Sequence, residues 1–255
     1  MSGNIRAAGA SVTSRALALL AAFDPDHRRL LLSELAARAG LPLPTAHRLV
    51  GELAGWGALT RTRSGHYVVG RRMWDLGLLA PQTAGLRALA SPFLQDLYGA
   101  TFATVHLAVR DGDRALYVDR VSGHASVPVV SDIGSRLPLH ATGVGKVLLA
   151  HAPDELQASV LADLERVTPY TITQAGRLVE QLRRIRRDGF ARTSEEMSLG
   201  ACSAAVPVRG AGEGVVAALG IVVPDLRREL DRLVAALRVA AQGISRTIAE
   251  LDSGQ

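Results

Sequence analysis

The apolar residues in the first part of the chain recur at the spacing of helices. A first amphipathic helix is predicted by residues three or four positions apart: Val12, Ala16, Leu19, Leu20 and Phe23. A short second helix should follow, with Ser33 as its N-cap, because a serine side chain accepts from the unpaired amides of a first turn. Gly40 should end it, since glycine tolerates the left-handed backbone of a helix stop.

A third helix is expected from Thr45 to Trp56, after a turn over residues 41–43. Pro44 suits its first position, where the missing N–H removes no hydrogen bond. Two short helices joined by a tight turn are typical of DNA-binding helix-turn-helix units. The apolar residues of this third helix recur at helical spacing: Ala46, Leu49, Val50 and Leu53.

Alternation replaces the helical period after the third helix. Leu59–Thr62 and His66–Val69 alternate on either side of Arg63-Ser64-Gly65, which predicts a hairpin with a basic tip. A hairpin in this place indicates the wing of a winged helix-turn-helix. Beyond it, Arg71–Leu79 has the pattern of a linker helix and Ala84–Tyr98 that of a further helix.

The rest of the chain mixes strand and helix patterns. Thr101–Val109 and Ala115–Val121 flank Asp111-Gly112-Asp113, which predicts a hairpin. Ser203–Val208 and Val215–Val223 predict a second one, and the continuous apolar run of the latter should lie in the middle of a sheet. The other predicted elements are a strand over Ser126–Ser131 and helices over Gly143–Ala150, Asp154–Leu164, Leu178–Asp188 and Leu226–Leu251.

The positive charge of the chain is concentrated in its first third. Residues 1–80 contain ten arginines and five acidic residues, so their net charge of +5 equals that of the whole chain. Such a concentration is expected where phosphates must be neutralised.

A single cysteine excludes a disulfide framework and indicates no metal cluster. No apolar run reaches about 18 residues, so we expect no membrane span. We also expect a cytoplasmic protein that needs no cofactor or metal.

Three segments in suitable order resemble the motifs of the IclR family of bacterial transcriptional regulators. They are GLPLPTAHRLVGELAGWG, LPLHATGVGKVLLA and GFARTSEEMSLGACSAAVPV, which begin at Gly40, Leu137 and Gly189. The resemblance implies an α+β fold: a winged helix-turn-helix DNA-binding domain (1–70), a linker helix (71–83) and a GAF-like α/β domain for effector binding and oligomerisation (84–255). It also implies homodimers, often paired as dimers of dimers.

The residues expected to read DNA lie at the start of the third helix. Thr45, His47 and Arg48 fall near the outer face of its first turns, from which side chains reach base edges in the major groove. A solvated helix face is the alternative. Leu43 and Pro44 stand where the family often has lysine and serine, which would replace hydrogen bonds by contact with a thymine methyl. Two residues of the wing should bind phosphates: Arg61 and Arg63.

The segment HATGVGK is the first candidate for effector contact. A phosphate-binding P-loop would need glycine at His140 and serine or threonine at Val147, and we expect no strand to lead into the segment. As a helix start it would present amides to a ligand carboxylate, and the resemblance places the effector pocket here. An ordinary glycine-eased helix start is the alternative. The expected contacts are His140, Thr142, Gly143 and Val144.

The remaining pocket residues follow from the resemblance alone: Thr193, Cys202, Ser203, Gly220 and Val222. Gly220 and Val222 occupy places where relatives frequently have serines. Without those hydroxyls, the buried oxygens of a small polar oxoacid would lack partners. We therefore expect a larger and less polar effector, such as an aromatic or ring-bearing carboxylate.

The sequence bears on two other classes of protein. An enzyme would need a convergent nucleophile, base or metal set, and no histidine pair has the spacing of a metal site. Cys202 has no histidine and acid placed beside it by the sequence, and for Glu195 and Glu196 solvated or structural roles are expected. We predict that the chain is not an enzyme. A constitutive DNA-binding protein whose second domain only oligomerises is harder to exclude.

Overall fold

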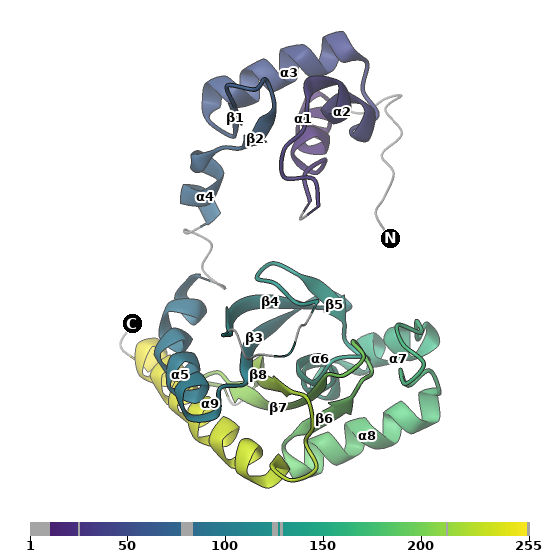
Figure 1. Cartoon of the computed structure of the whole chain (residues 1–255), viewed down its shortest axis with the longest axis vertical. Coiled ribbons are helices and arrows are strands. Elements are labelled where there is room, and N and C mark those ends of the chain that lie inside the picture. Colours follow the sequence, from purple (N-terminus) through teal and green to yellow (C-terminus); the bar gives the residue numbers. More distant parts are fainter. Residues whose placement is uncertain are drawn as a thin grey trace. The chain divides into compact units, whose positions relative to one another are not determined.

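The computed structural model describes residues 11–24, 26–77, 84–123, 127, 130–212 and 214–253. The chain divides into two compact units, Met1–Ala84 and Gly85–Gln255, and each is described by itself (Figure 1). Among the described residues, no helix is both long enough and apolar enough to cross a membrane.

The first unit has the predicted order of helix, helix, helix and two-stranded ribbon. Its elements are α1 (Val12–Leu20), α2 (Leu32–Arg38), α3 (Leu43–Trp56), β1 (Leu59–Arg61), β2 (Tyr67–Val69) and α4 (Arg71–Gly77). The two strands are antiparallel, with Leu59 opposite Val69. The predicted wing hairpin is therefore confirmed. The end of the predicted linker helix, residues 78 and 79, lies outside the described residues.

The apolar faces of these elements meet in one core. Leu19 of α1, Leu35 of α2, Leu49 and Val50 of α3 and Leu59 of β1 are all buried. Because each helix is too short to be stable alone in water, this shared burial stabilises the helix-turn-helix arrangement. Gly40 adopts a φ of +65° beyond the end of α2, as predicted for a helix stop.

Two details of the first unit differ from the sequence-based prediction. The N-cap of α2 is Leu31, not Ser33, which lies inside the helix. Glu34 provides the capping interaction instead, because its carboxylate accepts from the Leu31 N–H at 2.7 Å. Helix α3 begins at Leu43, so Pro44 is its second residue. A proline is tolerated there because the first four amides of a helix have no partner within it.

The second unit contains a sheet of antiparallel strands in the order β5-β4-β3-β8-β7-β6 (Figure 1). In its described part, β8 pairs with β3 on one side and β7 on the other. The predicted central position of this apolar strand is confirmed. The strand bounds are β3 (Thr104–Asp111), β4 (Arg114–Val121), β5 (Arg136–Pro138), β6 (Ala191–Ser194), β7 (Cys202–Arg209) and β8 (Val215–Val223).

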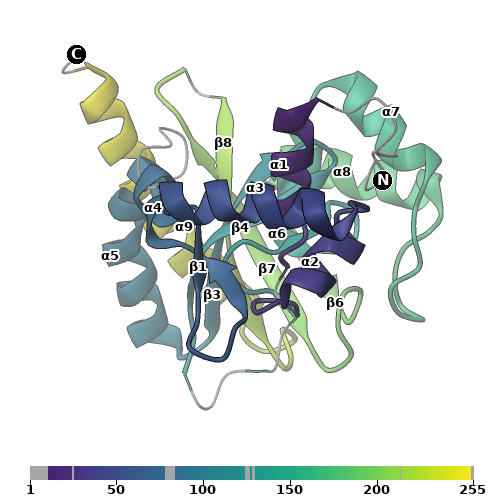
Figure 2. The same ribbon diagram turned by 90° about the horizontal axis from the view of Figure 1, so that it is seen from above.

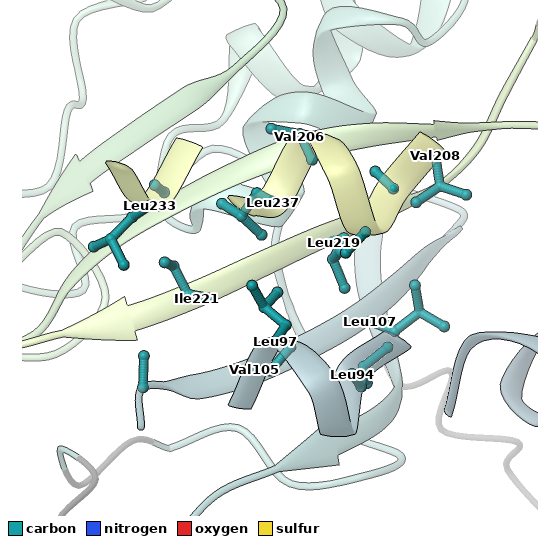
Figure 3. Close-up of a cluster of buried hydrophobic side chains, with 14 of the residues drawn as sticks. Leu94, Leu97, Val105, Leu107, Val206, Val208, Leu219, Ile221, Leu233 and Leu237 are labelled. Atoms are coloured by element: carbon teal, nitrogen blue, oxygen red, sulfur yellow. The ribbon is translucent and has the colours of Figure 1, made fainter. Parts of the chain in front are cut away.

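Helices cover both faces of this sheet, as both views of the second unit show (Figures 1 and 2). One face carries α5 (Ala84–Thr101) and α9 (Leu230–Ser253), and the other carries α6 (Gly143–Ala150), with α7 (Asp154–Ala162) and α8 (Ala175–Asp188) beyond it. Figure 3 shows the core under α5 and α9. Its fully buried leucines are Leu94, Leu107, Leu219 and Leu237.

The strand predicted over Ser126–Ser131 is not found in its described residues. Within 126–131 the described residues are 127, 130 and 131, and none lies in a strand; the others lie outside the described residues. Strands β5 and β6 were not predicted, because three or four residues are too few to show alternation. Strand β5 does lead into the HATGVGK segment, so only the missing glycine and hydroxyl residue argue against a P-loop there. Thr101 belongs to α5, and α9 begins at Leu230 rather than Leu226.

Candidate functional site

The residues predicted to read DNA lie on the solvent side of the first turns of α3. Leu43, Pro44, His47 and Arg48 are exposed, and Thr45 is half-buried. The Arg48 guanidinium is 3.6 Å from the Glu52 carboxylate in an exposed pair. Exposed pairs of this kind contribute little stability, so a phosphate or a base edge can replace the carboxylate at small cost.

The wing carries the other two predicted DNA contacts. Arg61 and Arg63 are exposed, and neither has a carboxylate partner in the described part of the chain. The Arg61 guanidinium lies 5.9 Å from the centre of the Tyr67 ring, which holds it on one side of the ribbon. Contact of these residues and of the α3 residues with DNA stays a prediction.

A cavity that is partly open to solvent lies on the α6 side of the sheet in the second unit. Its walls come from all of the strands β3 to β8, from the start of α6, from residues 130 and 131, and from the loop that joins β6 to β7. Seven of the nine residues predicted to contact an effector line this cavity: Thr142, Gly143, Val144, Thr193, Ser203, Gly220 and Val222.

The other two predicted residues do not line this cavity. The His140 Nε2 atom is 2.9 Å from the Glu165 carbonyl oxygen, and the side chain is buried at that contact. Cys202 precedes Ser203 in β7, and successive side chains of a strand point to opposite faces. Its sulfur therefore joins the core under α9, on the other side of the sheet.

The start of α6 is fixed tightly against the sheet. Thr142 is its N-cap, and the Thr142 hydroxyl accepts from the Gly145 amide at 3.0 Å. A Cβ atom on Gly143 would lie 2.5 Å from the Ser203 hydroxyl, so a larger residue would force that hydroxyl to move. The amide-rich, partially positive end of α6 thus borders the cavity.

Hydroxyl groups and a neutral histidine supply the other polar atoms of the wall. Thr193 and Ser203 share a hydrogen bond of 2.6 Å between their hydroxyl oxygens. The His106 Nε2 atom is 2.9 Å from the Ser131 hydroxyl, and the His106 ring meets the Tyr117 ring edge to face at 5.1 Å. No Asp, Glu, Lys or Arg is among the described residues of the lining.

His106, Tyr117 and Ser131 were not predicted as pocket residues. The position of His106 depends on pairing between strands that are distant in the sequence, because His106 lies opposite Gly220 across β3 and β8. Alternation within β3 shows that His106 and Val105 face different sides, but not which side holds a cavity. Only the register with β8 could have provided that signal.

Burial changes the pKa of both ring residues. It lowers the pKa of His106 to about 3, with the nearby Arg120 charge as a second cause. It raises the pKa of Tyr117 to about 12, and a hydrogen bond with the Thr142 side chain opposes that rise. Both groups are therefore uncharged at neutral pH, and the wall can hold a neutral or anionic ligand.

The low pKa of His106 predicts a loss of stability in acid. Below pH 6.5 the unfolded chain takes up a proton at this histidine, whereas the folded protein does so only near pH 3. This difference should destabilise the folded state by about 2 kcal/mol at pH 5 relative to pH 7. Urea unfolding at both pH values should show it, and His106→Gln should remove that part of the pH dependence. Equal pH dependence in both proteins would contradict the assignment.

Comparison with known proteins decides the family. Residues 12–63 match the IclR helix-turn-helix domain, and residues 80–246 match the domain described as "Bacterial transcriptional regulator IclR C-terminal". The chain belongs to the IclR family. The predicted fold, a winged helix-turn-helix followed by a GAF-like α/β domain, is thereby confirmed. This IclR-family protein is a DNA-binding transcriptional regulator.

Several known regulators are similar over most of their length. The regulator KdgR of Dickeya chrysanthemi is 31% identical, over 86% of this chain and 74% of its own. The Pca operon regulatory protein of Acinetobacter baylyi is 32% identical, over 87% of this chain and 81% of its own. Among solved structures, an IclR homologue from Microbacterium hydrocarbonoxydans in complex with 4-hydroxybenzoate has a TM-score of 0.90 and 33% identity, over 94% of this chain and 100% of its own.

Proposed function

We propose that the effector of this regulator is an aromatic or ring-bearing carboxylate that binds in the cavity at the start of α6. The observation that carries this proposal is the combination of a helix N-terminus with a wall that contains no ionised side chain in its described part. A carboxylate is stabilised by the amides and dipole of a helix start. A cationic ligand would find no counter-charge there.

The polar end of the ligand would lie beside Thr142 and Gly143. The amides of the first helical turn point out of α6, and the hydroxyls of Thr193 and Ser203 stand across from them on the sheet. Buried carboxylate oxygens need such donors, because an unpaired buried oxygen costs about 1–3 kcal/mol. The Gly143 and Val144 amides and the one hydroxyl of the Thr193–Ser203 pair that does not donate to the other give three such donors, without an arginine.

The rest of the wall suits an apolar body. Leu137, Val144, Met197 and Val222 contribute alkyl and thioether surface, while His106 and Tyr117 offer ring faces and edges. Predominantly apolar walls with a few placed polar groups are typical of small-molecule sites. The bound 4-hydroxybenzoate of the Microbacterium homologue is a ligand of this chemical class, which supports the proposal.

The two units have different roles in this proposal. We assign DNA binding to residues 1–70, the linker to 71–83, and effector binding and oligomerisation to 84–255.

Binding of paired half-sites requires at least a homodimer. Light scattering should therefore return twice the 26.9 kDa of one chain, or four times that mass if dimers pair. A mass of one chain at micromolar concentration would contradict this. We propose that the protein acts in the cytoplasm, where it binds double-stranded operator DNA.

We assign no catalytic role to the second unit. Cys202 faces the core under α9, away from the cavity, and Glu196 is engaged by a buried lysine. His106 contacts the Ser131 hydroxyl, as the base of a catalytic triad would contact its nucleophile. The described wall of the cavity, however, contains no Asp or Glu to complete such a triad. The known relatives are transcriptional regulators, which fits this assignment.

Replacement of Thr193 by valine tests the proposed pocket. The change keeps the shape of the side chain but removes a hydroxyl that bonds to Ser203, and the affinity for 4-hydroxybenzoate should fall by about tenfold, as for a lost hydrogen bond to a charged group. Isothermal titration calorimetry measures it. Thr247→Val on α9, which removes a hydroxyl bonded to the Gly243 carbonyl, is the matched control. Equal affinities of wild type and Thr193→Val would refute this placement.

A further inference from the structure

An ion pair is buried beside the proposed effector pocket, outside its lining. The Lys146 ammonium lies 2.7 Å from each carboxylate oxygen of Glu196 and 2.7 Å from the Gln181 side-chain oxygen. The Lys146 side chain is 0% exposed and that of Glu196 is 6% exposed. The three residues belong to α6, to α8 and to the loop after β6, so the pair joins three separate parts of the unit.

The loop that carries Glu196 is closed on itself. The Glu195 amide donates to the Ala201 carbonyl at 2.9 Å, and the Gly200 amide donates to the Glu195 carboxylate at 2.9 Å. Glu195 has a φ of +55°, an uncommon backbone conformation for a residue with a side chain. Such a conformation persists only where its surroundings enforce it. Loop 195–201 therefore has a defined shape that its neighbours maintain.

The same loop forms one side of the cavity. Met197, Ser198 and Ala201 line it, directly after the residue that binds Lys146. Lys146 in turn lies one helical turn beyond Thr142, whose neighbours present the amides proposed to hold the ligand. A rigid turn of α6 thus connects the anchor of the loop to the polar end of the cavity.

Stability alone does not account for this pair. Removing two charges from water costs several kcal/mol per ion, and apolar residues of similar volume in place of a buried pair are often neutral or stabilising. Burial lowers the pKa of Lys146 and raises that of Glu196, while their mutual attraction opposes both changes. The ion pair supplies a directional link between α6 and loop 195–201. Two methionines in the same places would not supply it.

We infer that Lys146 and Glu196 are positioning residues for the effector, which hold loop 195–201 against the cavity at the start of α6. This inference rests on the proposed function of the cavity. Neither residue touches the ligand. Their role is to fix Met197 and Ser198 at the distance from α6 that a bound ring requires, so that the cavity is formed before the ligand arrives.

The test compares wild type with the double variant Lys146→Met/Glu196→Met, because a single replacement would leave one buried charge unpaired and strongly destabilise the protein. The double variant should keep a thermal unfolding midpoint close to that of wild type. Hydrogen exchange of the Glu195 and Gly200 amides should nevertheless rise by about tenfold or more, and the affinity for 4-hydroxybenzoate should fall by about tenfold or more. Arg184→Met/Glu180→Met, an exposed pair 3.2 Å apart on α8, is the control and should change neither.

A merely structural role would lower stability and affinity together, or leave both unchanged. The inference is overturned if the stable double variant retains the wild-type exchange of loop 195–201. Wild-type affinity in a variant whose loop exchanges faster would overturn it as well. If wild type itself does not bind 4-hydroxybenzoate, that ligand is wrong, and the exchange of the loop amides still decides whether the pair holds the loop.

Discussion

Replacing Gly220 by tryptophan should unfold the second unit rather than simply fill the cavity. Gly220 lies in β8 directly below α6, and a Cβ atom there would be 2.7 Å from a methyl group of Val144. Real Cβ atoms do not come so close, and the Ala204 carbonyl at 3.3 Å prevents the strand from moving away. An indole would have to displace α6 from the sheet.

The expected effect is large because overpacking a tight core costs about 1–3 kcal/mol for even a few added methylenes. For tryptophan at this position we expect a loss of more than about 3 kcal/mol, a large part of the stability of an ordinary domain. Urea unfolding followed by far-UV circular dichroism measures it. Val216→Trp, at an exposed position of the same strand, should cost little. A Gly220→Trp protein as stable as wild type would show that α6 is not fixed on β8 as described.

Replacing Arg48 by alanine should weaken binding to the specific operator by roughly 1–3 kcal/mol, or about 5- to 150-fold. Arg48 is exposed near the start of α3, and its one described ionic partner is the exposed Glu52. Its guanidinium can therefore turn to a guanine edge or a phosphate when the helix enters the groove. Anisotropy titrations with specific and scrambled duplexes would separate the two kinds of contact.

Arg63→Ala provides the comparison within the same unit. Arg63 lies at the tip of the ribbon, so its loss should weaken binding to all sequences about equally and reduce the salt dependence by about one unit of slope. If Arg48→Ala binds its operator as tightly as wild type, α3 is not the reading helix in the way we propose. Equal effects of both variants on all sequences would assign Arg48 to the DNA backbone instead.

The long elements were predictable from the sequence because each has many positions that agree. The apolar stripe of α9 and the continuous apolar run of β8 both lie where their periods place them. Strands β5 and β6 have three and four residues, and neighbouring strands rather than their own sequence hold them in place. The cap of α2 was missed because Glu34, three residues after Leu31, forms it in place of a hydroxyl.

The cavity could be predicted only where a local motif marked it. The start of α6 follows from Thr142 and the glycines after it, and Ser203 from its motif in β7. His106 joins them through its register with Gly220, more than a hundred positions away, and Tyr117 follows because its strand pairs with β3. The link from Lys146 to Glu196 spans 50 positions and had no sequence signal beyond the presence of two charges in an apolar setting. Long-range pairing is the information that a single sequence lacks.

The central claim is that a ligand in the cavity beside α6 changes how tightly the first unit binds DNA. The most direct test is the operator dissociation constant of wild type with and without saturating 4-hydroxybenzoate, measured by anisotropy on a duplex that the protein selects from random sequences. Because linked sites change each other's affinity by typically 5- to 150-fold, we predict a change of that size, and Thr193→Val should need more ligand to reach it. An operator dissociation constant that stays the same while calorimetry shows the ligand bound would contradict the account.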